Sequence, residues 1–374
     1  MNSSDDHRYM ARAIRLAARG LYTTHPNPRV GCVLVKQGEV VGEGYHRRAG
    51  EPHAERNALA MAGDKARGAT AYVSLEPCSH HGRTPPCSDG LIEAGVSRVV
   101  AAMQDPNPLV AGAGLRQLES AGIQVEVGLM QTQAEAVNPG FIRRMRDGLP
   151  YVRAKLAMSL DGRTAMASGE SQWITSAEAR RDVHRMRARS SAIMTGVGTL
   201  LTDDPSLDVR LSPAELELDS DLETPRPLRV VLDPELTTPT RARMLQLPGE
   251  ILILCAETEL GKAVHLEEAG AQIMAVPGNR QQLDLNAVLR LLGGLQINEV
   301  MLECGATLAG SMLQLGLLDE LIIYLAPHIM GDGARGLFNL PALQHMADRY
   351  ELQIDDVRQV GRDIRITARP VSSH

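Results

Sequence analysis

Three short motifs place metal-binding side chains where helices are expected to begin. Pro52-His53-Ala54-Glu55 is followed by Pro77-Cys78 and then by Pro86-Cys87. Proline suits the first turn of a helix, and one imidazole with two thiolates is a ligand set that suits Zn²⁺. Because a helix N-terminus lowers the pKa of a nearby thiol, both cysteines are expected to bind as thiolates. The motifs therefore predict one metal centre built at helix beginnings.

The number of ligands indicates a catalytic metal. Structural zinc sites usually have four protein ligands, whereas His53, Cys78 and Cys87 leave one tetrahedral position for water. Glu55 is then expected to carry protons. The pattern matches the first half of the zinc-deaminase signature, H-x-E followed by P-C-x-x-C. It differs in the second half, because eight residues, Ser79 to Pro86, separate the cysteines instead of two.

Composition limits the class of protein. A chain of 374 residues predicts two domains, and 44% hydrophobic with 22% charged residues is typical of a soluble globular protein. The net charge of −6 argues against a nucleic-acid partner, which normally requires a basic face. Five cysteines form no disulfide framework, which favours the cytoplasm, and no apolar run indicates a signal peptide or membrane span.

The first half of the chain alternates helical and strand patterns, which predicts a layered α/β sheet. The expected helices cover residues 5–19, 52–61, 86–95, 112–121 and 132–146. The expected strands cover residues 30–35, 40–45, 69–75, 98–102 and 124–127. Breakers at 138–140 and 147–150 predict a boundary between a domain of residues 1–147 and a domain of residues 150–374.

A second α/β series follows that boundary. We expect strands at 152–158, 192–195, 229–232, 251–255, 272–276, 299–303 and 321–325, a closing strand pair at 349–357 and 363–368, and helices at 176–188, 283–292 and 308–315. The acidic stretch 212–224 is interpreted as a surface insertion. Glycine turns at 196–198 and 305–310 are either phosphate-binding turns or plain strand-to-helix connections, and the pattern alone does not decide between them.

The chain resembles the bifunctional deaminase/reductase family of riboflavin biosynthesis. The motifs that carry the resemblance are 25–31, 44–46, 52–55 and 76–87 in the first half, and 154–162, 202–207 and 303–305 in the second. The long spacing between the cysteines is this family's own form. The resemblance implies an N-terminal cytidine-deaminase-like three-layer α/β/α domain and a C-terminal dihydrofolate-reductase-like α/β domain.

The resemblance also implies the chemistry. The first domain would bind one Zn²⁺ and deaminate a small molecule, a diaminopyrimidinone carrying a ribosylamino 5′-phosphate. Glu55 would move the protons, and Asn27, His46, His80 and Arg83 would contact the substrate. The second domain would use NADPH to reduce the ribose of the deaminated product to a ribityl chain. A homo-oligomer, either dimer or tetramer, is expected.

In the second domain the resemblance implies three groups of residues. Cofactor contacts would be Ala157, Trp173, Thr199, Asp203, Gly305, Ala306, Thr307, Leu308, Ala309, Gly310 and Ser311. Substrate contacts would be Ser171, Arg187, Leu207, Arg210 and Glu303. The ionisable groups that we would test for proton transfer are Lys155, Asp203 and Glu303.

Three alternatives compete with this interpretation. A nucleic-acid base deaminase would share the zinc motif, but it disagrees with the negative charge and with an aromatic content of only 3%. A non-catalytic zinc module would need a fourth ligand, and no further Cys or His stands at suitable spacing. The second half would be only a dimerisation domain if it failed to bind NADPH.

Overall fold

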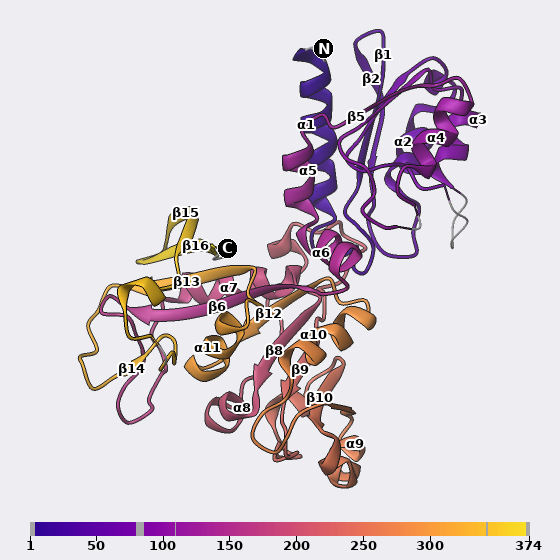
Figure 1. Ribbon diagram of the computed structural model, residues 1–374. Coiled ribbons are helices and arrows are strands. Elements are labelled where there is room, and N and C mark those ends of the chain that lie inside the picture. Colours follow the sequence, from indigo (N-terminus) through magenta and orange to yellow (C-terminus); the bar gives the residue numbers. More distant parts are fainter. Residues whose placement is uncertain (1–3, 80–85, 109, 342, 372–374) are drawn as a thin grey trace. The chain divides into compact units, whose positions relative to one another are not determined.

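The structure is a computed structural model that describes residues 4–79, 86–108, 110–341 and 343–371. The chain forms two compact units, Met1–Leu149 and Pro150–His374, and each is described by itself. Figure 1 shows a mixed α/β fold in each unit.

Unit 1 is built on one five-stranded sheet with strand order β2-β1-β3-β4-β5. Its strands are β1 (Gly31–Lys36), β2 (Glu39–Tyr45), β3 (Thr70–Val73), β4 (Arg98–Ala101) and β5 (Gln124–Val127). Its helices are α1 (Ser4–Arg19), α2 (Ala54–Ala62), α3 (Cys87–Glu93), α4 (Ala113–Ser120), α5 (Gln131–Val137) and α6 (Pro139–Asp147), with a 3₁₀ turn at Gly63–Ala66. The β1 strand is antiparallel to β2 and β3, whereas β3, β4 and β5 are parallel.

Helices cover both faces of this sheet, which gives three layers. One core cluster joins Met10 of α1 and Phe141 of α6 to Val33 of β1. The other joins Ala58 of α2 and Leu91 of α3 to the opposite face of the sheet. The two clusters explain why β1 is apolar at successive positions, since both of its faces are buried. Figure 1 shows α1 and α5 on one side and α2, α3 and α4 on the other.

Two features of unit 1 concern its helices. The single helix predicted for residues 132–146 is wrong, because α5 ends before Asn138 and α6 begins at Pro139. Proline has no N–H to continue a helix but fits the first position of a new one.

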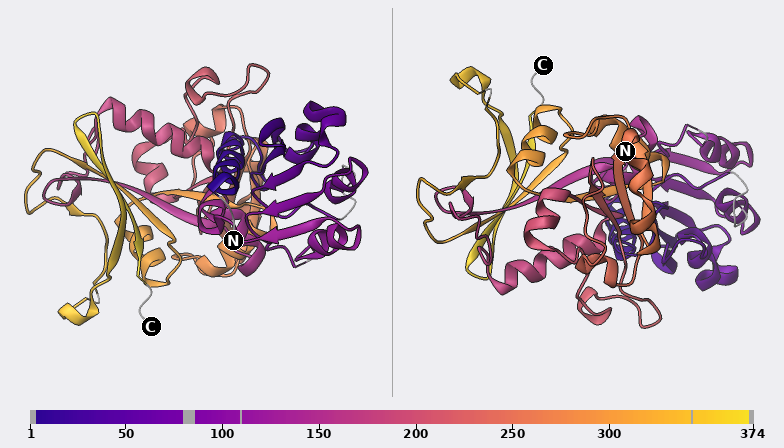
Figure 2. Two further views of the ribbon diagram at one scale, coloured as in Figure 1. Left: turned by 90° about the horizontal axis from the view of Figure 1, so that it is seen from above. Right: turned by 90° about the horizontal axis from the view of Figure 1, so that it is seen from below.

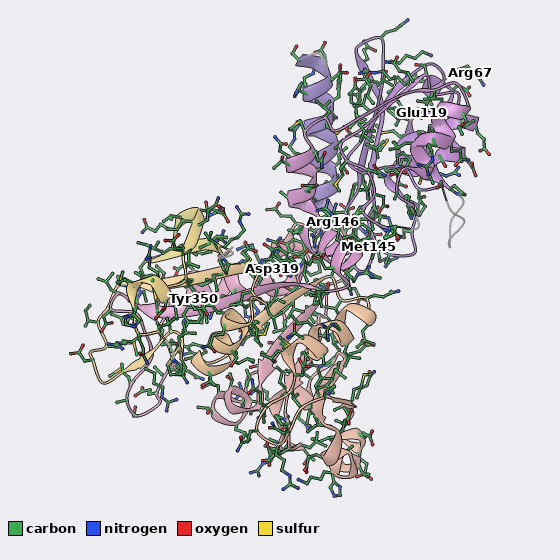
Figure 3. All side chains as sticks on the ribbon, in the orientation of Figure 1. Arg67, Glu119, Met145, Arg146, Asp319 and Tyr350 are labelled. Carbon is green, nitrogen blue, oxygen red and sulfur yellow. The ribbon has the colours of Figure 1, made fainter. Side chains whose placement is uncertain are left out.

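At the other side of the unit, Arg67 and Glu119 are exposed near the α2–α4 layer, so this layer has a solvated outer face (Figure 3).

Unit 2 contains a nine-stranded sheet with order β11-β10-β9-β8-β12-β6-β13-β16-β15. Its strands are β6 (Tyr151–Ser159), β8 (Ala192–Gly196), β9 (Leu228–Leu232), β10 (Ile251–Ala256), β11 (Gln272–Val276), β12 (Glu299–Glu303), β13 (Glu320–Ala326), β15 (Leu352–Val360) and β16 (Asp363–Pro370). A separate pair joins β7 (Arg163–Ala165) to β14 (Arg335–Gly336). The helices are α7 (Ala177–Arg189), α8 (Val197–Asp203), α9 (Val264–Glu268), α10 (Leu285–Gly294) and α11 (Ala306–Gln314), and 3₁₀ turns lie at Ala214–Leu216, Arg243–Gln246, Glu257–Lys262 and Met346–Asp348.

The strands from β11 to β13 are parallel, and the β15–β16 hairpin adds two antiparallel strands at one end of the sheet (Figure 2). Because β6, β8 and β12 are parallel neighbours, their carboxyl ends meet at one edge of the sheet. Ligand sites of open α/β sheets lie at that edge. The predicted cap of the 176–188 helix is confirmed, since Ser176 accepts a hydrogen bond from the Ala179 N–H.

The acidic stretch 212–224 is more ordered than its composition indicates. Leu216 and Leu222 are buried, a 3₁₀ turn covers Ala214–Leu216, and Glu215 pairs with Arg181 of α7. The stretch therefore packs on unit 2 through its leucines and exposes its charges.

None of the helices in the described part of the chain has the length and apolar character needed to cross a membrane.

Candidate active sites

The three predicted zinc ligands come together in unit 1. His53 immediately precedes α2, Cys78 follows β3, and Cys87 is the first residue of α3. The His53 Nδ1 atom lies 3.6 Å from the Cys78 Sγ and 3.4 Å from the Cys87 Sγ. All three ligand atoms lie within 4.8 Å of one another. Two helix beginnings and the loop after β3 therefore build the cluster, so the expected helix beginning at Cys78 is wrong.

The cluster fits a zinc ion on two grounds. Zn–S bonds of about 2.3 Å and Zn–N bonds of about 2.0–2.1 Å place neighbouring ligand atoms of a tetrahedron roughly 3.6 Å apart. The observed separations from His53 match that spacing. A hydrogen bond from Cys87, followed by one from His53, lowers the pKa of Cys78 to about 4, which favours a thiolate ligand.

Glu55 lies beside the cluster in the first turn of α2. Its side chain is only 3% exposed, and its Oε2 atom has no hydrogen-bond partner among the residues that the structure describes. Burial, followed by the charge of Cys78, raises the pKa of Glu55 to about 7. A buried carboxylate oxygen without a partner is costly, so the Oε2 atom is suited to a polar group brought by a ligand.

Glu76 holds the segment that carries Cys78, and sequence reasoning missed this role. Its carboxylate is buried and accepts backbone N–H bonds from Asp105, Gly112 and Gly114, each at 3.0 Å. A Cβ atom on Gly114 would lie 2.0 Å from the Pro77 carbonyl oxygen, so only glycine permits this close approach. The Glu-Pro-Cys sequence was a visible signal, but the partners of Glu76 are far along the chain.

Asn27 and His46 form a second polar group near the metal cluster. The His46 Nδ1 atom lies 3.3 Å from the Pro52 carbonyl oxygen, and its Nε2 atom lies 3.1 Å from the Asn27 Nδ2. The ring of His46 is 2% exposed and meets the ring of His53 edge-on, with ring centres 5.2 Å apart. Both nitrogens of His46 are therefore already bonded, whereas Asn27 keeps its carbonyl oxygen for another partner. The predicted contacts His80 and Arg83 lie outside the described residues.

In unit 2, Lys155 of β6 and Glu303 of β12 are directly paired across neighbouring strands. Arg187 of α7 binds Glu303 through two bonds, from Nε to Oε1 at 2.6 Å and from Nη2 to Oε2 at 2.9 Å. Burial lowers the pKa of Lys155, while Arg187 holds the pKa of Glu303 below its usual value against the effect of burial. The Lys155 ammonium lies 6.0 Å from the ring centre of Tyr324 and makes no hydrogen bond or ion pair within the described ranges.

The two glycine turns lie at the same edge of the sheet. A Cβ atom on Gly305 would lie 3.9 Å from the Thr199 Oγ1, and one on Gly196 would lie 3.5 Å from the Leu308 side chain. Not every residue of the predicted 305–311 turn is equally accessible. Ala309 and Gly310 are buried, and a Cβ on Gly310 would lie 2.3 Å from the Asn339 oxygen. A bound cofactor therefore has access mainly to the beginning of α11.

The other predicted residues of unit 2 have different surroundings. Ser171 donates a hydrogen bond to Asp203 at 3.4 Å, which joins the loop before α7 to the end of α8. Trp173 is 67% exposed and stacks under the Arg180 guanidinium at 4.6 Å, and Ala157 is half-buried on β6.

The segment Leu207–Arg210 follows α8 and carries two predicted substrate contacts. Leu207 is 1% exposed and has a left-handed backbone, with φ of 48°. The Arg210 side chain is 63% exposed and lies 3.5 Å from the Asp208 carboxylate. A cavity of about 490 Å³ lies beside this segment and is lined by Leu207, Asp208 and Arg229, but Lys155 and the 305–311 turn do not line it. His184, which contacts Arg210, was also missed by sequence reasoning.

Comparison with known families agrees with these two sites. Residues 3–103 match the cytidine and deoxycytidylate deaminase zinc-binding region, and residues 150–366 match the RibD C-terminal domain. The fold and the sites thus define a zinc-dependent deaminase joined to an NADPH-dependent reductase.

Individual relatives cover nearly the whole chain. The riboflavin biosynthesis protein RibD of Escherichia coli is 55% identical over 96% of this chain and 98% of its own length, and that of Haemophilus influenzae is 51% identical over 98% of each. The structure of Acinetobacter baumannii RibD has a TM-score of 0.89 at 44% identity and covers 98% of this chain and 99% of its own. The chain therefore belongs to the RibD family and is a bifunctional enzyme of riboflavin biosynthesis.

A further structural relative carries a more detailed description. A Thermotoga maritima structure, described as a diaminohydroxyphosphoribosylaminopyrimidine deaminase and 5-amino-6-(5-phosphoribosylamino)uracil reductase, has a TM-score of 0.84 at 32% identity. It covers 98% of this chain and 99% of its own.

Proposed function

We propose that residues 1–147 deaminate a diaminopyrimidinone that carries a ribosylamino 5′-phosphate, and that residues 150–374 then reduce the ribose of the product to a ribityl chain. Glu55 is buried beside a three-ligand cluster, and its Oε2 atom has no hydrogen-bond partner among the described residues; this observation best supports the first step. The description of the Thermotoga maritima relative supports the substrate.

For the deamination, His53, Cys78 and Cys87 would hold the metal. When bound there, zinc lowers the pKa of a water and so provides the nucleophile at neutral pH. Glu55 would accept a proton and return it to the leaving amine, so that ammonia departs and a ring carbonyl remains. Asn27 binds the substrate through its carbonyl oxygen, and His46 orients Asn27 instead of contacting the substrate itself. His80 and Arg83 remain proposed contacts of the same substrate.

For the reduction, we assign proton donation to Lys155. When bound, NADPH would supply a hydride to the ribose C1, and the ring oxygen would need a proton as the sugar opens. Burial lowers the pKa of Lys155, and its ammonium makes no hydrogen bond within the described ranges, so it releases a proton more readily than a paired lysine. Glu303 is fixed by two bonds to Arg187, and Asp203 accepts a bond from Ser171, so these two act better as positioning groups.

The remaining contacts divide by accessibility. Arg210, which is mostly exposed, suits the substrate phosphate better than Arg187, whose guanidinium is taken by Glu303 and Asp208. Ser171 and the backbone of Leu207, whose side chain lies in the core, complete the substrate side. NADPH is proposed to contact Ala157, Trp173, Thr199, Asp203, Gly305, Ala306, Thr307 and Leu308, with Ala309, Gly310 and Ser311 supporting the turn.

The deciding experiment supplies the substrate with and without NADPH. We expect ammonia without cofactor, and NADPH oxidation only after ammonia has formed. NADPH oxidation before any ammonia release would contradict the proposed order. Lys155→Met should lower the reduction rate roughly 10²- to 10⁴-fold and leave ammonia release unchanged. Arg362→Met, on an exposed turn, is the matched control.

We also propose the cellular location, the partners and the oligomeric state of the enzyme. Cytoplasmic location and the absence of a nucleic-acid partner are supported by the reduced cysteines and the net charge of −6. A homo-oligomer, dimer or tetramer, is supported by exposed apolar side chains on β15, where Ile354 and Val357 are 60% and 58% exposed. Sedimentation would measure the mass in solution of the parent protein and of the Ile354→Lys variant. If both proteins sediment as monomers of equal mass, the proposed homo-oligomer is refuted.

A further inference from the structure

His184 is a buried histidine of unit 2 that the reactions described above do not use. It lies on α7, is 9% exposed, and its Nδ1 atom is 3.2 Å from the backbone nitrogen of Arg210. A backbone N–H can only donate, so Nδ1 must carry a lone pair and the ring proton must be on Nε2. This bond joins the helix to the segment proposed to hold the substrate.

The same helix holds that segment at a second point. Arg187, one turn further along α7, donates from Nη1 to the Asp208 carbonyl oxygen at 2.9 Å. Thus α7 donates to the backbone oxygen of Asp208 and accepts from the backbone N–H of Arg210. Leu207 anchors the beginning of the segment, since its side chain lies in the core with Ile193 and Val231. Two bonds of opposite direction and one buried side chain fix the position of the segment.

The surroundings keep His184 neutral. The charged groups that face it are Arg187 on its own helix, Asp208 and Arg210 on the segment, and Glu303 on β12. Burial, followed by the two guanidinium groups, lowers the pKa of His184 to about 4. The imidazole therefore accepts the Arg210 N–H over the whole neutral range of pH.

We propose that His184 is a positioning residue of the reductase: it fixes the 207–210 segment so that the Arg210 side chain meets the substrate phosphate. This inference rests on the proposed function of unit 2 and adds a residue that sets the affinity for a phosphate-bearing substrate. Loss of the acceptor leaves a backbone N–H without its partner and lets the segment shift. The cost should fall on substrate binding, because the hydrogen bond of His184 goes to Arg210, which is proposed to bind the substrate.

Two variants of His184 separate the acceptor from the shape of the ring. His184→Phe keeps an aromatic ring but removes the acceptor, and His184→Asn places an oxygen near the position of Nδ1. With the pre-deaminated phosphate as substrate, His184→Phe should raise the KM for that compound roughly five- to 100-fold. The kcat, the KM for NADPH and ammonia release from unit 1 should stay within about twofold. His184→Asn should recover most of the loss, and His265→Phe on an exposed face is the matched control.

A double variant tests whether His184 acts through Arg210. If it does, His184→Phe should add little to the KM of Arg210→Ala, whereas independent residues would multiply their effects. Multiplied effects would overturn the proposal, as would equal KM values for the Phe and Asn variants. A rise in the KM for NADPH as large as the rise for the substrate would overturn it as well.

A spectroscopic measurement on the parent enzyme keeps the proposal testable if a variant does not fold. In ¹⁵N-labelled enzyme at pH 7, His184 should show an unprotonated Nδ1 and a protonated Nε2. A protonated Nδ1 would refute the proposal. A parent enzyme that does not reduce the substrate at all would instead refute the proposed function of unit 2, so the two failures are distinguishable.

Discussion

The sharpest prediction concerns the substitution Glu55→Gln. The amide has nearly the shape of the carboxylate but cannot take a proton from water and return it to the amine. General acid–base catalysis contributes roughly 10²- to 10⁴-fold, so ammonia release should fall by that factor, equivalent to about 3–5 kcal/mol in the barrier. Because a neutral amide is less costly to bury than a carboxylate, the variant should be at least as stable as the parent.

The assay measures ammonia with zinc-loaded enzyme and, separately, NADPH oxidation with the pre-deaminated compound. The second rate should not change, which shows that the variant is folded and that unit 2 works independently. Glu51→Gln makes the same chemical change at a carboxylate that pairs with Arg48 at 2.6 Å, and it should leave both rates near those of the parent. Ammonia release by Glu55→Gln within tenfold of the parent would refute the role of Glu55.

Three further predictions address the bound zinc, the contact of Gly114 with the Pro77–Cys78 segment, and His184. Removal of zinc by a chelator, or Cys87→Ala, should abolish ammonia release and leave NADPH oxidation with the pre-deaminated compound intact, and loss of both of these rates would contradict separate sites. Gly114→Ala should push its Cβ against the Pro77 carbonyl and weaken zinc binding, measured by competition with a chelating dye; unchanged affinity would argue against this loop as a support. Between pH 6.5 and 4 the unfolded His184 binds a proton that the folded form does not, so stability should fall as pH falls, by on the order of 3 kcal/mol. Urea unfolding of unit 2 at several pH values should show a weaker dependence for His184→Asn, and an identical dependence would refute this assignment.

The sequence predicts well those features that depend on local patterns. Short apolar runs place most strands within a few residues, and proline next to His53 and Cys87 locates helix beginnings. The metal cluster was predictable because Cys and His spacing limits the chemistry more strongly than the fold. The helix at 132–146 failed because the periodicity continues across Pro139, where the chain breaks into two helices.

The sequence predicts less well those features that depend on partners far along the chain. The bonds of Glu76 to residues near α4 and the bond of His184 to Arg210 have no local signal. The same holds for Arg187, whose type indicates a phosphate contact but whose guanidinium is bound to Glu303. A residue type suggests what a side chain can bind, but only the tertiary structure decides which partner reaches it first.

The position of β6 has a consequence for how the protein is made. This strand opens unit 2, yet it lies between β12 and β13, which leave the ribosome much later than β6. All strands of the unit 1 sheet have been synthesised once β5 is complete, so this unit can fold while translation continues. The largely apolar β6, by contrast, stays unpaired until its neighbouring strands have been synthesised. Nascent chains halted before residue 299 should therefore hold a folded first unit attached to an unfolded second one, which chaperones would need to protect.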